Sequence, residues 1–287
     1  MSGAPDFFRW CVLACFAAAA LATAPAWAAS PLLEEAAAQV LPHEGHQSRV
    51  ALGASMVKLA RAGVIDQRKF EALYAARGGL PAEFKDILSK PTFRPMRITR
   101  ENAQVYVNLL WSLGLANRMA ANEASPLNGR DRFRYASTGG WTLGKEANGG
   151  AYFNSFPIVE LSAPQEALVV AVARNSYRPC CNNSTFFQDC NHGSALLGLL
   201  ALGAYQGLSE AQLYREALAF NAFWFTHQYV HTALYFQVVK GIAWKDVDAR
   251  TVMGAEFSSA SGWQANVARE LQTRGILPSQ GNSDCSA

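Results

Sequence analysis

Apolar residues in the first third of the chain recur at helical spacing and predict packed helical hairpins. Between residues 32 and 119 they return every three or four positions, as on the buried face of a helix. Ser48 is expected to cap a helix over residues 50–62, because a serine hydroxyl accepts a hydrogen bond from a free amide of the first turn. The X-Pro pairs within residues 90–95 predict an extended link, because proline disfavours helix in the residue before it. Thr99 then opens a long helix with an apolar face.

The middle of the chain, residues 122–177, shows no clear helical period and is predicted to form loops or short strands. Six glycines stand among aromatic side chains between residues 122 and 164, a composition typical of irregular structure. The aromatic residues either line a ligand site or pin a long loop onto the core. The apolar run 167–173 is a strand or a short helix, and its period alone does not decide between them.

The last third of the chain carries two helices with clear boundary signals. Asp189 precedes an apolar run and is expected to cap a helix over residues 190–206. Ser209 and Gln212 form a capping box that opens a second helix, which runs to about Val239. Because the connection between them is short, the two helices are predicted to pack as an antiparallel hairpin.

The chain is therefore predicted to be mainly α. The expected architecture is a multi-helix globular bundle with a Gly/aromatic-rich irregular middle segment and a C-terminal antiparallel helical hairpin. The predicted parts are a signal peptide over 1–28, an N-terminal helical portion over 29–121, the middle segment over 122–177 and a C-terminal helical portion over 178–287. A single domain over 29–287 is the alternative, because apolar faces on both sides of the proline-containing link favour shared packing.

The first residues have the form of a secretory signal peptide. Arg9 supplies a positive charge, residues 10–23 are apolar, and Pro25 precedes a small-residue cleavage pattern that ends at Ala28. Cleavage near Ala28 would leave a periplasmic or secreted protein. The apolar run is shorter than the roughly 20 residues of a membrane span, so no stable span is expected in the mature chain.

Composition narrows the expected partners of the protein. The formal net charge is +3 and no run of Lys and Arg stands out, so no nucleic-acid partner is expected. A mature chain of about 260 residues is long enough to bury a core without cross-links. The expected partners are a small molecule or a metal ion, and the oligomeric state is left open.

The cysteine count favours disulfide bonds. Of six cysteines, removal of the leader would leave Cys180, Cys181, Cys190 and Cys285. An even number of cysteines in an oxidising compartment favours two bridges. In one arrangement Cys180 or Cys181 pairs with Cys190, and the remaining one pairs with Cys285. Spacing alone does not fix the connectivity.

A Cys/His cluster is the strongest chemical signal in the chain. Three cysteines and a histidine fall within thirteen positions at the start of the first hairpin helix. Two further histidines, four positions apart, share one face of the second helix, a spacing that presents two imidazoles to one metal ion. In the predicted register the second helix projects past the first, so these histidines come level with the cysteines. The residues expected to meet there are Cys180, Cys181, Cys190, His192, His227 and His231.

These residues predict a transition-metal or haem centre. Thiolate and imidazole ligands together suit zinc, copper or iron, and not calcium or magnesium. The chain has no Cys-x-x-Cys-His motif, so any haem would be bound non-covalently. Trp224 and Gln228 lie on the histidine face of the second helix and are candidate cofactor-binding residues. The leading hypothesis is an exported protein with a Cys/His centre, of which a metal-dependent oxidoreductase is one form.

Two other functions fit the same residues. The first is a disulfide-braced periplasmic binding or scaffold protein without a catalytic centre. The second is a thiol enzyme in which Cys190 or Cys181 is the nucleophile or redox thiol. His192 or His227 would then be the base, and Asp189 or Asn191 would orient it. The three hypotheses differ in metal content and thiol state, and the sequence leaves open whether the protein is an enzyme.

The segment His43-Glu44-Gly45-His46 suggests a metalloprotease helix only superficially. Its histidines are three positions apart, not four, and a glycine lies between them. This segment is predicted to be an exposed loop.

Overall fold

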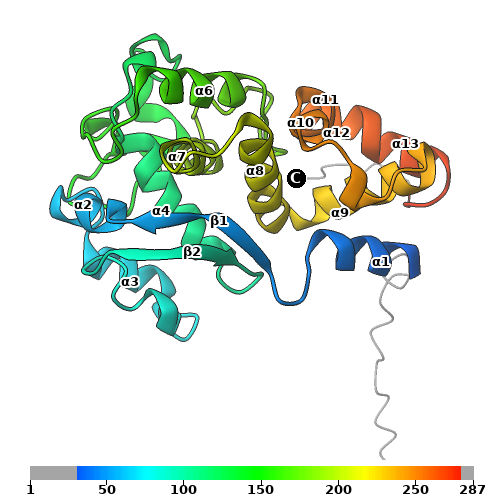
Figure 1. The fold of residues 1–287 in the computed structure, drawn as a ribbon, viewed down its shortest axis with the longest axis horizontal. Coiled ribbons are helices and arrows are strands. Elements are labelled where there is room, and N and C mark those ends of the chain that lie inside the picture. The colour runs from blue at the N-terminus through cyan, green and yellow to red at the C-terminus, as the bar shows by residue number, and fades with distance from the viewer. Residues whose placement is uncertain (1–30, 279–287) are drawn as a thin grey trace, which may run out of the picture.

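The computed structural model describes residues 31–278, which fold mainly into helices beside one small sheet (Figure 1). The predicted signal peptide over 1–28 and Cys285 lie outside the described residues. No helix within the described range is long and apolar enough to cross a membrane.

The α-helices are α1 (Pro31–Val40), α2 (Ser55–Arg61), α3 (Gln67–Ala75), α4 (Ala103–Ala116), α5 (Ala136–Gly139), α6 (Ala163–Arg174), α7 (Asn191–Tyr205), α8 (Glu210–Trp224), α9 (Thr226–Tyr235), α10 (Ala249–Met253), α11 (Ala255–Ser258), α12 (Ala260–Trp263) and α13 (Arg269–Thr273). Shorter 3-10 segments are Ala82–Phe84, Ala120–Ala124, Arg132–Arg134, Gly149–Ala151 and Trp244–Asp246, and π segments are Phe236–Lys240 and Gln264–Ala268.

The sheet forms where the sequence predicts the start of a helix. β1 (His46–Gly53) pairs antiparallel with β2 (Thr92–Ile98). Ser48 is therefore a buried strand residue and not a helix cap, and α2 begins only at Ser55. The helix prediction was wrong because the apolar residues of β1 gain a strand partner far along the chain, which a local pattern does not reveal. The extended link predicted over 90–95 is confirmed, since most of it lies in β2.

Hydrogen bonds to the Glu216 side chain link β1 to α8. Its buried carboxylate accepts hydrogen bonds from the Ser48 hydroxyl at 2.7 Å and the Arg49 amide at 3.0 Å. The Nε2 atom of His46 lies 3.2 Å from the same carboxylate. His46 is thus a half-buried residue of β1, which corrects the prediction that it belongs to an exposed loop. Burial tends to raise the pKa of Glu216, but the hydrogen bonds from His46, Ser48 and Arg49 outweigh it and hold that pKa below its usual value.

α7 packs most extensively against α4, through two glycines. A Cβ atom on Gly114 would lie 1.8 Å from the carbonyl oxygen of Ser194, and one on Gly198 would lie 2.4 Å from that of Leu110. Only glycine leaves room for backbones this close. α8 also contacts α7, but less extensively. The first turn of α7, which carries the cysteine cluster, is therefore positioned mainly by α4.

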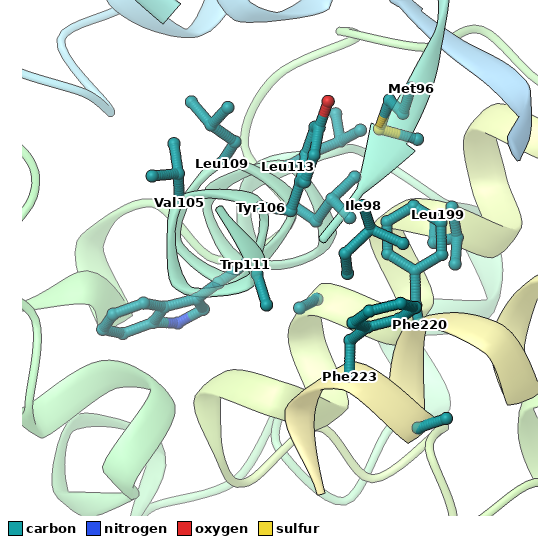
Figure 2. Close-up of a cluster of buried hydrophobic side chains, with 14 of the residues drawn as sticks. Met96, Ile98, Val105, Tyr106, Leu109, Trp111, Leu113, Leu199, Phe220 and Phe223 are labelled. Carbon is teal, nitrogen blue, oxygen red and sulfur yellow. The ribbon is translucent and has the colours of Figure 1, made fainter. Parts of the chain in front are cut away.

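One hydrophobic core joins the first and the last segments that the structure describes. Side chains from β2, α4, α7 and α8 converge in Figure 2. α1 also crosses to the C-terminal side of the molecule and packs against α9 (Figure 1). Segments that are far apart in sequence thus share packing. The labelled members of the core are Met96, Ile98, Val105, Tyr106, Leu109, Trp111, Leu113, Leu199, Phe220 and Phe223.

The glycine-rich middle segment is more helical than its composition predicts. Residues 167–173 lie within α6, which a capping box at Ser162 opens, so this run is a helix and not a strand. The aromatic side chains hold the loops to the core. Trp141 packs edge-on against Trp111 with ring centroids 4.8 Å apart, and the Tyr152 hydroxyl donates to the carbonyl of Gly63.

The long helix predicted from residue 210 to 239 is broken at Phe225. This residue has φ −128° and ψ 54°, so α8 ends at Trp224 and α9 leaves in a new direction (Figure 1). The Phe225 ring packs against His192, with ring centroids 4.6 Å apart. The straight helix assumed in the predicted register therefore does not exist, because tertiary packing overrides the local helical period.

Candidate metal centre

A buried arginine organises the loop that carries the cysteines. The side chain of Arg178 is fully buried, and its guanidinium donates to the carbonyls of Asn183 and Ser184 at 2.9 and 2.8 Å. It also donates to the Phe187 carbonyl at 3.1 Å and to the carboxylate of Asp189. These hydrogen bonds hold the loop around the guanidinium group of Arg178. Buried charge is tolerated when it is paired and fully hydrogen-bonded in this way.

Three sulfur atoms meet beside this arginine. The Sγ atom of Cys180 lies 3.4 Å from that of Cys181 and 3.6 Å from that of Cys190. Arg178 Nε donates to Cys190 Sγ at 3.2 Å, and the Gly193 amide donates to the same sulfur at 3.3 Å. The predicted convergence of these cysteines is therefore present. Within residues 31–278 the three thiols are free, since each spacing exceeds the S–S bond length of about 2.05 Å.

Cys190, and not Asp189, caps α7. Its sulfur accepts the amide hydrogen bond from the first turn, whereas the Asp189 carboxylate pairs with Arg178. The sequence predicts a cap at Asp189 because carboxylates are common there. The buried guanidinium draws that carboxylate away, and the thiol takes the capping position.

The contacts within the cluster shift the pKa values of its cysteines in opposite directions. Hydrogen bonds from the Cys180 and Cys181 thiols, with the Arg178 guanidinium beside them, hold the pKa of Cys190 well below its usual value. The contacts with Cys181 and Cys190, together with burial, raise the pKa of Cys180. The lowered pKa favours the thiolate form of Cys190, which lies at the positive end of α7.

His192 completes a set of possible metal ligands. A ring nitrogen of His192 and the sulfurs of Cys180 and Cys190 lie within 4.8 Å of one another. Burial lowers the pKa of His192, which favours the neutral imidazole that binds metals. Its ring rests against Phe225, and the Trp224 ring lies 6.0 Å away. Trp224 is therefore part of the wall around this imidazole.

Cys181 and Asp189 form a second group with Cys190. Their ligand atoms also lie within 4.8 Å of one another. Two hydrogen bonds hold this side of the loop to α12. The Ala260 amide donates to the Cys181 carbonyl at 2.9 Å, and the Ser261 amide donates to the Asn182 side chain at 2.8 Å. The cysteine loop is thus fixed from two directions.

His227 and His231 do not join the sulfur cluster. Their rings contact each other with centroids 4.0 Å apart, and the Trp263 ring stacks on His231. Among the described residues, neither histidine belongs to a group of three metal-ligand side chains. The predicted single centre is therefore two separate places, because the break at Phe225 redirects α9. Gln228 lies with the histidine pair, where its backbone carbonyl accepts a hydrogen bond from the Trp263 indole.

Comparisons of the chain with protein-family models, with curated proteins and with solved structures find no match. The chemistry of its own residues is therefore the basis for a function.

Sequence reasoning missed Arg178. An arginine two positions before a Cys-Cys pair reads as a surface charge, because arginines are almost never fully buried unless paired. The signal available in the sequence is the set of polar residues Asn183, Ser184 and Asp189, which supply most of the acceptors that this guanidinium uses. Only the folded loop shows that they converge.

Proposed function

We propose that this chain is an exported metal-binding protein whose centre is formed by Cys180, Cys181, Cys190 and His192. The observation that carries the proposal is the meeting of three sulfurs at the start of α7, with a ring nitrogen of His192 within 4.8 Å of the Cys180 and Cys190 sulfurs. Three thiolates and an imidazole are a ligand set typical of structural zinc sites. Zinc is the ion that this proposal names, and copper or iron are the alternatives that share these ligand preferences.

The spacing of the sulfurs supports a tetrahedral ion. With a Zn–S bond of about 2.3 Å, two sulfurs at a tetrahedral angle lie about 3.8 Å apart. The observed spacings of 3.4 and 3.6 Å need only a small expansion. Ligands that converge on one point favour a single ion over haem, which needs a flat slot and one or two axial ligands.

The charge around the sulfurs supports the same proposal. A dication with three thiolates carries one net negative charge, and the buried guanidinium of Arg178 lies against one of those sulfurs. Its hydrogen bond to Cys190 orients that ligand and partly neutralises the negative charge on the sulfur. Outer-shell donors have this role in metal sites. A bound zinc ion would cross-link the cysteine loop to α7, which is a stabilising role and not a redox one.

Metal content and thiol protection test the proposal. The purified chain is expected to hold one equivalent of zinc, and a strong chelator is expected to expose three additional thiols to alkylation. Cys190→Ser is expected to abolish binding, whereas His43→Ala, an exposed histidine, serves as the matched control. A chain with no metal and all its thiols oxidised would support the disulfide-braced scaffold and contradict this proposal.

A thiol enzyme is the second candidate, because the pKa of Cys190 is lowered beside Arg178 and Cys180 lies within reach as a second thiol. In thiol–disulfide exchange, the Cys190 thiolate would attack a substrate disulfide and form a mixed disulfide with it. Cys180 would then attack Cys190, which forms a Cys180–Cys190 disulfide and releases the substrate as a dithiol. However, Cys190 is only 9% exposed. A sheltered thiolate favours metal binding over attack on a large substrate. Rapid labelling of Cys190 alone near neutral pH would reverse that preference.

Export is proposed on the signal-peptide pattern of residues 1–28. In an oxidising compartment, bound zinc would keep the three thiols of the centre from forming disulfides. Expression in a secreting host followed by intact-mass measurement tests export. A mature mass that begins at Ala29 supports export, and an uncleaved chain retained in the cytoplasm contradicts it.

A further inference from the structure

A second chemical site lies on α9, apart from the sulfur cluster. His227 and His231 are four positions apart and share one face of the helix, with ring centroids 4.0 Å apart. Both line a cavity of about 110 Å³. Trp263 forms one wall, with its ring 5.9 Å from His227 and 6.2 Å from His231. Gln264 and Gln272 also line this cavity.

One of these imidazoles is buried without a hydrogen-bond partner. His231 is only 4% exposed, and its Nδ1 atom has no partner among the described residues. Buried polar atoms are nearly always satisfied, and His231 also lines the cavity, so its unpartnered imidazole points to a ligand. Desolvation and the neighbouring His227 lower the pKa of His231 to about 4, and burial also lowers that of His227. Lowered pKa values favour the neutral imidazole, which is the form that coordinates metals.

The lining of the cavity decides the class of ligand. Its described walls carry two imidazoles, two amides, an indole and apolar groups, and no carboxylate or ammonium group. Charged organic ligands would find no counter-charge there. Calcium and magnesium need several oxygen ligands, which this wall does not offer. Imidazole instead suits copper, nickel and zinc.

We propose that His227 and His231 bind one divalent transition-metal ion, with copper(II) bound more tightly than zinc(II). Two imidazoles four positions apart on a helix chelate a single ion. The preference for copper follows from the usual order of affinities for nitrogen sites. The remaining coordination positions face the cavity, where water or a small molecule has room to bind. This proposal does not rest on the zinc site at the cysteines.

Copper titration tests the proposal in a chain that keeps its full length and carries no polyhistidine tag. All six cysteines are replaced by serine, because thiols bind and reduce copper(II). One equivalent of copper(II) is expected, with an electron paramagnetic resonance spectrum that shows imidazole nitrogen coupling. His227→Ala and His231→Ala are each expected to weaken binding at least about tenfold, because each loses one of two ligands. His43→Ala is the matched control and should leave binding unchanged.

A second measurement keeps the test independent of the cysteine substitutions. In the wild-type chain first loaded with zinc, copper(II) is expected to quench the fluorescence of Trp263, which lies beside both imidazoles. The quenching should disappear in His231→Ala and in Trp263→Phe. Copper binding that survives both histidine substitutions, or a spectrum without nitrogen coupling, would overturn the proposal. Neither result would alter zinc-dependent thiol protection, so the two sites fail separately.

Discussion

Arg178 donates from its Nε atom to the Sγ atom of Cys190 at 3.2 Å, and both side chains are buried. This contact joins the cation that closes the loop to the thiol that caps α7. A fixed positive charge therefore lies in the middle of the sulfur cluster. It orders the loop, and after the Cys180 and Cys181 thiols it also helps to lower the pKa of Cys190.

The first prediction is that Arg178→Ala destabilises the fold by about 3–5 kcal/mol, because it breaks a buried pair and orphans several carbonyls. Arg178→Lys is also destabilising, since an ammonium group does not reproduce the planar fork. Urea unfolding at neutral pH measures both. Arg68→Ala, at an exposed arginine, is the matched control. A loss within 0.5 kcal/mol or so at Arg178 would show that the loop does not depend on this residue.

The second prediction concerns the crossing of α4 and α7. Gly114→Ala and Gly198→Ala each place a methyl group against backbone, and each is expected to cost about 1–3 kcal/mol or more. Gly129→Ala is the control, because the nearest atom to its Cβ is an ordinary 3.5 Å contact. Thermal unfolding of the three variants compares them. Equal Tm values for all three would contradict the close approach.

The third prediction is a pH dependence that comes from Glu216. Its pKa is held below the ordinary value of 4.5 in the folded protein, because hydrogen bonds from His46 and Ser48 outweigh burial. The stabilisation is therefore fully present above about pH 4.5 and is lost as pH falls through the lowered pKa. Glu216→Gln is expected to cost about 1–3 kcal/mol at pH 7 and to flatten this acid loss.

The free energy of unfolding measured from pH 7 down to pH 3 checks this dependence. Glu34→Gln replaces an exposed carboxylate and is the control. An acid profile of Glu216→Gln that overlays the wild-type profile would remove Glu216 as its source.

The fourth prediction follows from metal removal. If zinc cross-links the loop to α7, a strong chelator lowers the Tm of the wild-type chain. Cys190→Ser is expected to start at the lower Tm and to show no further shift, because the ligand that α7 contributes is gone. Differential scanning calorimetry with and without chelator measures both shifts. A chelator effect of equal size in Cys190→Ser would place the metal elsewhere.

Several features of this protein could be predicted from the sequence, because they depend on contacts between residues close together in the chain. The capping box of Ser209 and Gln212 predicts the start of α8, and the structure confirms it, because the bonds that open a helix involve residues three positions apart. The mainly helical class follows from the same short-range periods. Cys190 and His192 are two positions apart, so their proximity was also readable from the sequence.

Only the tertiary structure decided the remainder. β1 exists because β2 and Glu216 supply partners from distant parts of the chain. The break at Phe225 separates His231 from the cysteines, although a continuous helical period had predicted their meeting. Arg178 is buried because loop carbonyls and a carboxylate converge on it only after folding. In each case the deciding contact is long-range, and its free energy exceeds the weak local preference that the sequence expresses.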